Sequence, residues 1–297
     1  MTDMSGLRLI FMVDAKMDQR SQFISSLSMV FLRLRAVMLT LLVACGAQAN
    51  ETATLATNGS VVPILQTLIQ DFATQSPGLK INLLLPPAGS GGAIKGVATG
   101  GVDLGVIARA LNPDEANHKL EVVPWVRTAF VIVANHSGVV RSHTLDDLAA
   151  IWSGATTHWP DGQPIRLLLR SPEDADIIAL RAMSPGMNRA VDIAFSRRGL
   201  PRADNDLSNL ELLEKVPGAI GGSTFGLLKS SRSRLTALPV GGVVPGISTL
   251  KDGTYCCQRT LFLVSDGSPR SRPFITYLRS ARAMTLLENN GYIAARP

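Results

Sequence analysis

The sequence predicts an α/β fold with two lobes, each a mainly parallel sheet flanked by helices, arranged as a clamshell. Short apolar runs alternate with amphipathic segments along most of the chain, which is the pattern of parallel sheets covered by helices. The chain crosses between two sets of such elements twice, as proteins that close by hinge bending do. Its 297 residues, 46% apolar and 18% charged, are enough for two lobes.

Residues 1–49 have the form of an export signal that precedes the folded chain. Arg33 and Arg35 form a basic region, residues 36–43 form an apolar region, and residues 47–49, Ala-Gln-Ala, form a small-x-small cleavage site before Asn50. We therefore expect an exported protein that resides in the periplasm.

A second cleavage site lies just upstream of the first. Leu42-Val43-Ala44-Cys45 resembles the lipobox of bacterial lipoproteins, in which Cys45 would carry a lipid anchor. The soluble product is favoured, and a lipoprotein anchored at Cys45 is the alternative. No later stretch approaches the run of about 18 apolar residues that indicates a membrane-spanning helix.

The charge of the exported part argues against a nucleic-acid partner. The whole chain has a formal net charge of +6. Removing residues 1–49 takes away five of the 29 Lys and Arg residues and three of the 23 Asp and Glu residues, which leaves +4. Because this excess forms no long basic run, a small anion is the better partner.

Cysteine and histidine spacing predicts no metal site and no cofactor. A disulfide between the neighbours Cys256 and Cys257 would close no useful loop, so two free or loosely coupled thiols are expected. The four histidines show no ligand spacing and lie in turn-like surroundings. The sequence also lacks a GxSxG nucleophile motif, so we do not expect an enzyme.

The apolar pattern gives the elements of the first lobe in chain order. Strands are expected at residues 55–58, 81–85, 102–107 and 122–133, with one helix at 61–73 and another that follows the glycine loop and ends at Gly100-Gly101. Ser60 is the expected N-cap of the first helix. Since ligands bind beyond the carboxyl ends of parallel strands, Ser60, Ser90 and Arg109 are expected to meet at one edge of the sheet.

The second lobe and the return to the first follow the same alternation. Helices are expected at residues 145–152, 177–183, 188–196, 207–215 and 273–287, and strands at 165–169, 218–222, 235–240 and 261–264. The predicted division places residues 50–133 with 225–297 in the first lobe and residues 134–224 in the second. Glu173, Asp174 and Asp176 open a helix, where acidic side chains complement the helix dipole without any ligand.

A glycine loop at residues 87–95 is the strongest local indication of a binding site. It turns an apolar strand into a helix, so that unpaired backbone N–H groups and the Ser90 hydroxyl face one point, as an anion requires. Neither nucleotide motif fits, because Lys95 follows Ile94 and Ile94 stands where GxGxxG needs a glycine or alanine. A tight turn without a ligand is the alternative interpretation.

A series of motifs extends this pattern from about Ala53 to Ala294. They are Gly59-Ser60-Val61-Val62-Pro63, Gly89-Ser90-Gly91-Gly92-Ala93-Ile94-Lys95, Val102-Asp103-Leu104-Gly105, Leu145 to Gly154 with Trp159, Gly218-Ala219-Ile220-Gly221, and Gly253-Thr254-Tyr255 before Arg259-Thr260-Leu261. In order and spacing they resemble the substrate-binding proteins of phosphate ABC transporters, within the type II periplasmic binding-protein superfamily. The resemblance implies a monomer that captures a small oxyanion, phosphate foremost, and delivers it to an ABC permease.

The resemblance also implies roles for individual residues. Ser60 and Ser90 match serines that contact the anion, with help from the N–H groups of Gly91 and Gly92, and Gly89 belongs to the same loop. Arg170 matches the arginine that pairs with the anion.

Two positions depart from the phosphate pattern. Ala108 and Arg109 stand where such proteins often carry an acidic or hydroxyl residue, and residues 174–176, Asp-Ala-Asp, stand where they carry Ser-Gly-Thr. A carboxylate about 4 Å from a phosphate oxygen costs roughly 4 kcal/mol at an effective dielectric constant near 20. Asp174 and Asp176 are therefore expected to favour an anion that still carries a proton, or a ligand with a cationic group. A sensory or scaffold protein of the same fold with a non-phosphate ligand is the alternative function.

Overall fold

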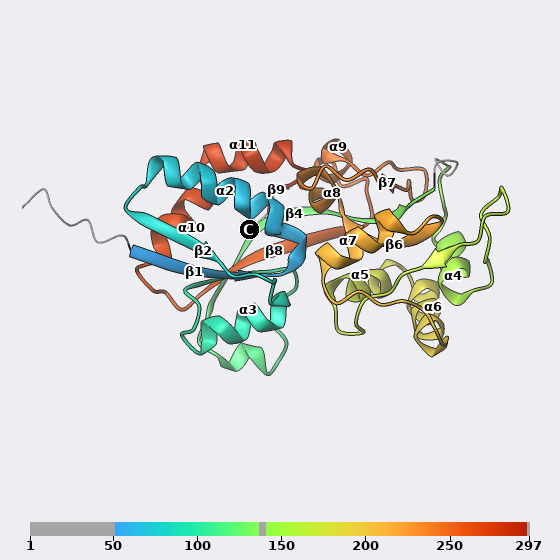
Figure 1. The fold of residues 1–297 in the computed structure, drawn as a ribbon, viewed down its shortest axis with the longest axis horizontal. Coiled ribbons are helices and arrows are strands. Elements are labelled where there is room, and N and C mark those ends of the chain that lie inside the picture. Colours follow the sequence, from blue (N-terminus) through green and yellow to red (C-terminus); the bar gives the residue numbers. More distant parts are fainter. Residues whose placement is uncertain (1–50, 137–140, 296–297) are drawn as a thin grey trace, which may run out of the picture. The chain divides into compact units, whose positions relative to one another are not determined.

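The computed structural model describes residues 51–136 and 141–295 (Figure 1). The expected export signal over residues 1–49, with Cys45, lies outside them. The strands are β1 Glu51–Thr57, β2 Leu79–Leu83, β3 Leu104–Ile107, β4 Glu121–Ala134, β5 Arg166–Leu167, β6 Ala219–Thr224, β7 Thr236–Ala237, β8 Gln258–Ser265 and β9 Ile293–Ala294. The α-helices are α2 Val62–Gln75, α3 Gly89–Ala98, α4 Leu145–Ser153, α5 Ala175–Met183, α6 Pro185–Ser196, α7 Asp206–Lys215, α8 Phe225–Ser230, α9 Ile247–Lys251, α10 Arg272–Leu278 and α11 Ala281–Asn289, and 3₁₀ turns lie at η1 Gly59–Val61 and η2 Glu115–Asn117.

The strands pair in the order β2-β1-β3-β8-β4-β6-β5, with β7 and β9 also paired to β4. The α/β fold with helices flanking a central sheet is thus confirmed (Figure 1). β1 runs parallel to β2 and β3, and β5 runs parallel to β6, as the alternating pattern predicts. β8 and β4 instead pair antiparallel with β3 and β6 and with each other, so the sheet is mixed.

The long strand β4 explains this mixture because it connects the two parts of the sheet. Its residues 121–129 pair with β8, and its residues 130–134 pair with β6. β8 brings the chain back along the same line, so the outgoing and returning strands must run in opposite directions.

Separate apolar clusters support the two ends of the sheet. In the first, the predicted apolar face of α2 is confirmed, since Val61, Leu65, Leu68 and Phe72 are all buried. The cluster on the other side gathers β6, the second half of β4 and the helices α4 to α7. Its buried members also include Leu227, Leu228, Leu238, Val240, Leu250 and Tyr255.

Two predicted helix boundaries are wrong. Ser60 does not cap the first helix: residues 59–61 form the 3₁₀ turn η1, and the Ser60 hydroxyl instead accepts a hydrogen bond from the Asn58 amide. The single helix expected at residues 273–287 is divided into α10 and α11. The break occurs at Ser280, whose extended backbone and side chain cap α11 by accepting from the N–H of Ala283.

The expectation of two free or loosely coupled thiols is also wrong, since a disulfide joins Cys256 to Cys257. The pair lies directly before β8, where the Cys257 carbonyl accepts a hydrogen bond of 2.9 Å from the N–H of Phe130 on β4. Among the described residues no helix is long and apolar enough to cross a membrane.

A close contact between Gly226 and Tyr292 gives a test of how α8 packs. A Cβ atom on Gly226 would lie 2.2 Å from Cζ of the buried Tyr292 ring, whose hydroxyl donates to the Ser60 carbonyl at 3.2 Å. Gly226→Ala should therefore displace the ring and destabilise the fold by about 1–3 kcal/mol in urea unfolding followed by circular dichroism. Gly246→Ala is the control, because the nearest atom to its new Cβ would lie at 4.0 Å. Equal unfolding midpoints for the two variants would contradict this packing.

Candidate ligand site

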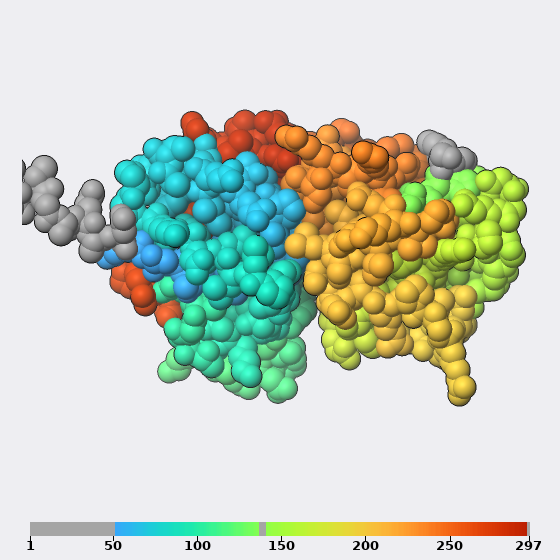
Figure 2. Space-filling model, viewed as in Figure 1, coloured from blue at the N-terminus to red at the C-terminus, as the bar shows by residue number. Residues whose placement is uncertain are grey.

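A cavity of about 280 Å³ lies between the glycine loop and the loops that precede α5 and α7. Figure 2 shows a notch in the surface between the residues coloured teal and those coloured yellow. From the first part of the chain the lining includes Asn58, Gly59, Gly89, Ser90, Gly91 and Arg109. From the second it includes Arg170, Glu173, Asp174, Asp204, Asn205 and Asp206.

The glycine loop contributes hydrogen-bond donors to the cavity. α3 begins at Gly89 without a side-chain cap, so the first N–H groups of the helix have no intrahelical partner. The Ser90 hydroxyl oxygen accepts a hydrogen bond of 3.1 Å from the N–H of Ala108, which leaves its own proton to donate. Gly89, Ser90 and Gly91 line the cavity, whereas Gly92 is not among the lining residues.

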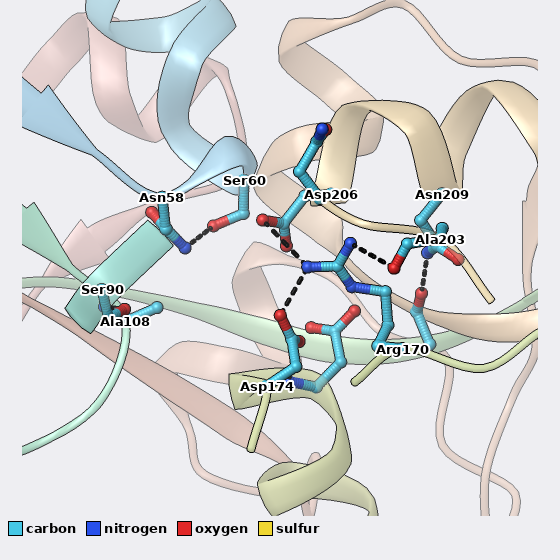
Figure 3. Close-up of polar contacts among 12 residues, drawn as sticks. Asn58, Ser60, Ser90, Ala108, Arg170, Asp174, Ala203, Asp206 and Asn209 are labelled. Atoms are coloured by element: carbon cyan, nitrogen blue, oxygen red, sulfur yellow. Dashed lines mark hydrogen bonds and ion pairs between the residues drawn. The ribbon is translucent and has the colours of Figure 1, made fainter. Parts of the chain in front are cut away.

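The end of β1 contributes Asn58 and Gly59, and it holds Ser60 beside them. The Asn58 amide donates to the Ser60 hydroxyl at 2.7 Å, and both side chains are buried (Figure 3). Asn58 lines the cavity, whereas Ser60 is not among the lining residues. The Asn58 Oδ1 atom accepts no hydrogen bond from the residues that the structure describes.

Arg170 lies at the centre of the opposite wall (Figure 3). It is 4% exposed, forms an ion pair with Asp174, lies 3.8 Å from Asp206, and donates to the Ala203 carbonyl at 3.3 Å. Burial alone would lower the pKa of Arg170, but the neighbouring aspartates outweigh it and raise that pKa. The guanidinium is therefore a permanent charge, and its buried Nε–H finds no acceptor in the described part of the chain.

Asp206, at the start of α7, lies between Arg170 and the 3₁₀ turn η1. A Cβ atom on Gly59 would lie 2.9 Å from Asp206 Oδ2, so only glycine allows this approach. Burial, followed by the negative charge of Asp176, raises the pKa of Asp206 to about 7, while Arg170 and Arg259 oppose that rise. The Asp206 carboxyl therefore resists ionisation in the folded protein.

The aspartates after Arg170 have different roles. Asp174 lines the cavity and caps α5, because its Oδ1 accepts a 2.8 Å hydrogen bond from the N–H of Asp176. The helix-capping interpretation thus holds for Asp174. Asp176 lies outside the lining, where it forms a buried 2.6 Å ion pair with Arg259, whose guanidinium stacks on Phe130.

Arg109 reaches the cavity with its charge already paired. Its two Nη atoms donate to the carboxylate of Glu115 at 2.7 and 2.8 Å. A bidentate pair of this kind fixes the guanidinium in one plane. Glu115 was not among the expected site residues. No feature of the neighbouring sequence distinguishes it from other surface carboxylates or marks it as the partner of Arg109.

Sequence reasoning also missed Asp204 and Asp206 as lining residues. Asp204 lies just before α7 and Asp206 is its first residue, and Asn205 between them caps the helix by accepting from the N–H groups of Leu207 and Ser208. The Asp-Asn-Asp run was the available signal. This run was not singled out from the sequence, because its neighbour Arg170 lies more than thirty residues away in sequence.

The raised pKa of Asp206 predicts how Asp206→Asn changes stability with pH. A carboxyl group that resists ionisation in the folded state costs nothing at low pH and destabilises the fold as pH rises toward its folded pKa. The variant should therefore gain about 1–3 kcal/mol relative to the wild type between pH 5 and pH 8 in urea unfolding. Glu211→Gln, on the exposed side of α7, should show no such gain. A constant difference between Asp206→Asn and the wild type across this range would refute the assignment.

Solved structures share this fold at low sequence identity. One, described as a phosphate ABC transporter substrate-binding protein with bound phosphate from Clostridium perfringens, has a TM-score of 0.71 and 19% identity, covering 83% of this chain and all (100%) of that one. An ABC-type phosphate transport receptor from Vibrio cholerae has a TM-score of 0.61 and 20% identity, covering 82% of this chain and 100% of that one. The molybdate-binding protein of Azotobacter vinelandii has a TM-score of 0.58 and 11% identity over 82% of this chain and 100% of that one.

No curated protein matches the sequence. A family model described as a PBP superfamily domain, where PBP denotes periplasmic binding protein, matches residues 43–282. That match spans most of the chain and agrees with the mixed sheet and with the fold of the solved structures. The chain belongs to the PBP superfamily.

Proposed function

We propose that this protein is an extracytoplasmic solute-binding protein that captures a small oxyanion between two lobes and delivers it to an ABC permease. The observation that carries the proposal is the convergence on one cavity of the uncapped start of α3, the Ser90 hydroxyl and the Arg170 guanidinium. Inorganic phosphate is the first candidate, because the Clostridium and Vibrio proteins that share the fold are described as phosphate proteins.

In this proposal, the anion contacts the N–H groups of Gly89 to Gly91 and the Ser90 hydroxyl from one wall, and Arg170 Nε from the other. Each charge-assisted hydrogen bond contributes about 1.5–3 kcal/mol. A few of these bonds match the roughly 8 kcal/mol of a micromolar complex. Ser60, Gly92 and Asp176 support the walls from behind the lining rather than from within it. The chemistry needed is binding alone, with no catalytic step and no metal.

The sequence predicts lobes of residues 50–133 with 225–297 and of residues 134–224. The buried apolar residues between Leu227 and Tyr255 pack in the same cluster as the second lobe, so in this proposal the segment that holds them moves with the second lobe and not with the first. Closure then bends β4 and β8, since the chain crosses between the lobes in these strands. We propose a monomer, because a clamshell needs no second copy to enclose its ligand.

The location follows from the expected export signal. We propose a soluble periplasmic protein cut before Asn50, with a lipoprotein anchored at Cys45 as the alternative. The low charge of the exported part supports a small-anion ligand over nucleic acid.

Anion binding is tested by thermal shift and calorimetry on the exported form. Phosphate at 100 times its dissociation constant should add about 2.7 kcal/mol of stability. Ser90→Ala should weaken phosphate binding about 10- to 100-fold, because it removes one charge-assisted donor. Ser196→Ala, on the exposed surface of α6, is the matched control. Failure of phosphate, sulfate, molybdate and phosphonates alike to stabilise the protein would refute the proposal.

Export is tested by mass spectrometry of the protein from its native cell. We expect a mature chain that begins at Asn50, or at a lipidated Cys45. An intact N-terminus upstream of Arg33 would show that residues 1–49 are not removed.

A further inference from the structure

Acidic side chains outnumber basic side chains in the cavity, which disfavours an anion. Its lining holds the guanidinium groups of Arg109 and Arg170, together with the carboxyl groups of Glu173, Asp174, Asp204 and Asp206. A multiply charged inorganic anion would therefore enter a site in which carboxylates outnumber cations, and like charges in such a site repel.

The two cations are also already partnered. Arg109 is held by Glu115, and Arg170 is held by Asp174 with Asp206 nearby. Each arginine can donate hydrogen bonds to a bound anion, but it contributes little net positive charge. The full attraction between an arginine and an oxyanion is thus reduced before any ligand arrives.

The remaining carboxylates point to a second kind of ligand group. Glu173 and Asp204 line the cavity, are exposed, and form no hydrogen bond or ion pair with another described residue. They come from the two loops that precede α5 and α7, so they form one acidic wall with Asp206. Carboxylates that are accessible and uncompensated are a natural partner for an ammonium group.

Two residues that line the cavity also carry buried polar atoms without a partner. Asn58 and Arg170 are both 4% exposed and both line the cavity. Asn58 Oδ1 accepts no hydrogen bond, and Arg170 Nε donates none, within the described residues. A buried polar atom without a partner is costly, so these atoms point to one acceptor and one donor on the ligand.

The helix-start donors and the uncompensated carboxylates therefore occupy different walls of the cavity. The N–H groups at the start of α3 and the Ser90 hydroxyl lie on one side, and the acidic wall lies beside Arg170 on the other. A volume of about 280 Å³ leaves room for a short side arm beside a tetrahedral oxyanion. Protonation of Asp206 alone does not remove the imbalance, because Glu173, Asp174 and Asp204 remain.

We infer that the ligand is a zwitterion: a phosphonate or phosphate ester whose short arm ends in an ammonium group. The oxyanion lies against the glycine loop, and the ammonium group lies against Glu173, Asp204 and Asp206. This inference rests on the proposed oxyanion-binding function and names the class of oxyanion.

Calorimetry with three probes at pH 7.5 tests the zwitterionic ligand separately from the proposed oxyanion-binding function. 2-Aminoethylphosphonate should bind at least tenfold more tightly than ethylphosphonate, which lacks only the ammonium group, and more tightly than inorganic phosphate. If ethylphosphonate or phosphate binds as tightly as the amino compound, the zwitterion inference is overturned and oxyanion capture stands. If none of the three binds, both fail.

A double variant tests which side chains recognise the ammonium group. Glu173→Gln with Asp204→Asn removes two exposed, unpaired charges, so it should fold like the wild type. It should lower the affinity ratio of 2-aminoethylphosphonate to ethylphosphonate at least fivefold, and it should leave ethylphosphonate bound equally well or better. Glu211→Gln removes one carboxylate from α7 outside the cavity and should leave the ratio unchanged. An unchanged ratio in the double variant would overturn the acidic wall as the ammonium site.

Discussion

The arrangement of the site depends on burying several charges together. Arg170 pairs with Asp174 and Asp206, and Arg259 pairs with Asp176. A hydrogen bond from the Asp176 N–H to Asp174 connects the two sets, and most of these side chains are almost inaccessible to solvent. Buried charges are tolerated only where partners compensate them, and removal of one partner typically costs about 3–5 kcal/mol. The position of each side chain is thus fixed by the others.

This charge cluster connects elements that the sequence keeps far apart. Arg259 belongs to β8, Asp176 to α5 and Asp206 to α7, so the ion pairs join the returning strand to the helices that border the cavity. Arg259 also stacks on Phe130 of β4, the strand that connects the two parts of the sheet. Contacts of Arg259 therefore join α5 to both of the long strands β4 and β8.

Much of the fold could be predicted because its signals are local. The apolar face of α2 and the turn from strand to helix before α3 depend on residues within one or two helical turns, and the structure has both, although α3 already begins at Gly89, inside the expected loop. The antiparallel pairing of β4 with β8 could not be predicted, because it joins Arg127 to Thr260 across more than a hundred residues. The prediction that Ser60 caps the first helix was wrong for a local reason. The Ser60 hydroxyl accepts a hydrogen bond from the Asn58 side-chain amide and not from a backbone N–H of the helix.

The residues of the candidate site also fall into those that the sequence predicts and those that it does not. Ser90 and Arg170 were predictable because each follows a strand at a sheet edge, where parallel connections gather ligand groups. Asp206 was not, since its contact with Arg170 depends on a bridge between Leu169 and Arg202 that brings the two loops together. Proteins described as binding phosphate and molybdate share this fold at 11–20% identity, so the sheet and its cores do not select the ligand. The ligand is instead selected by a few side chains at the starts of α3, α5 and α7. Adding or removing one carboxylate there changes which net ligand charge the cavity favours.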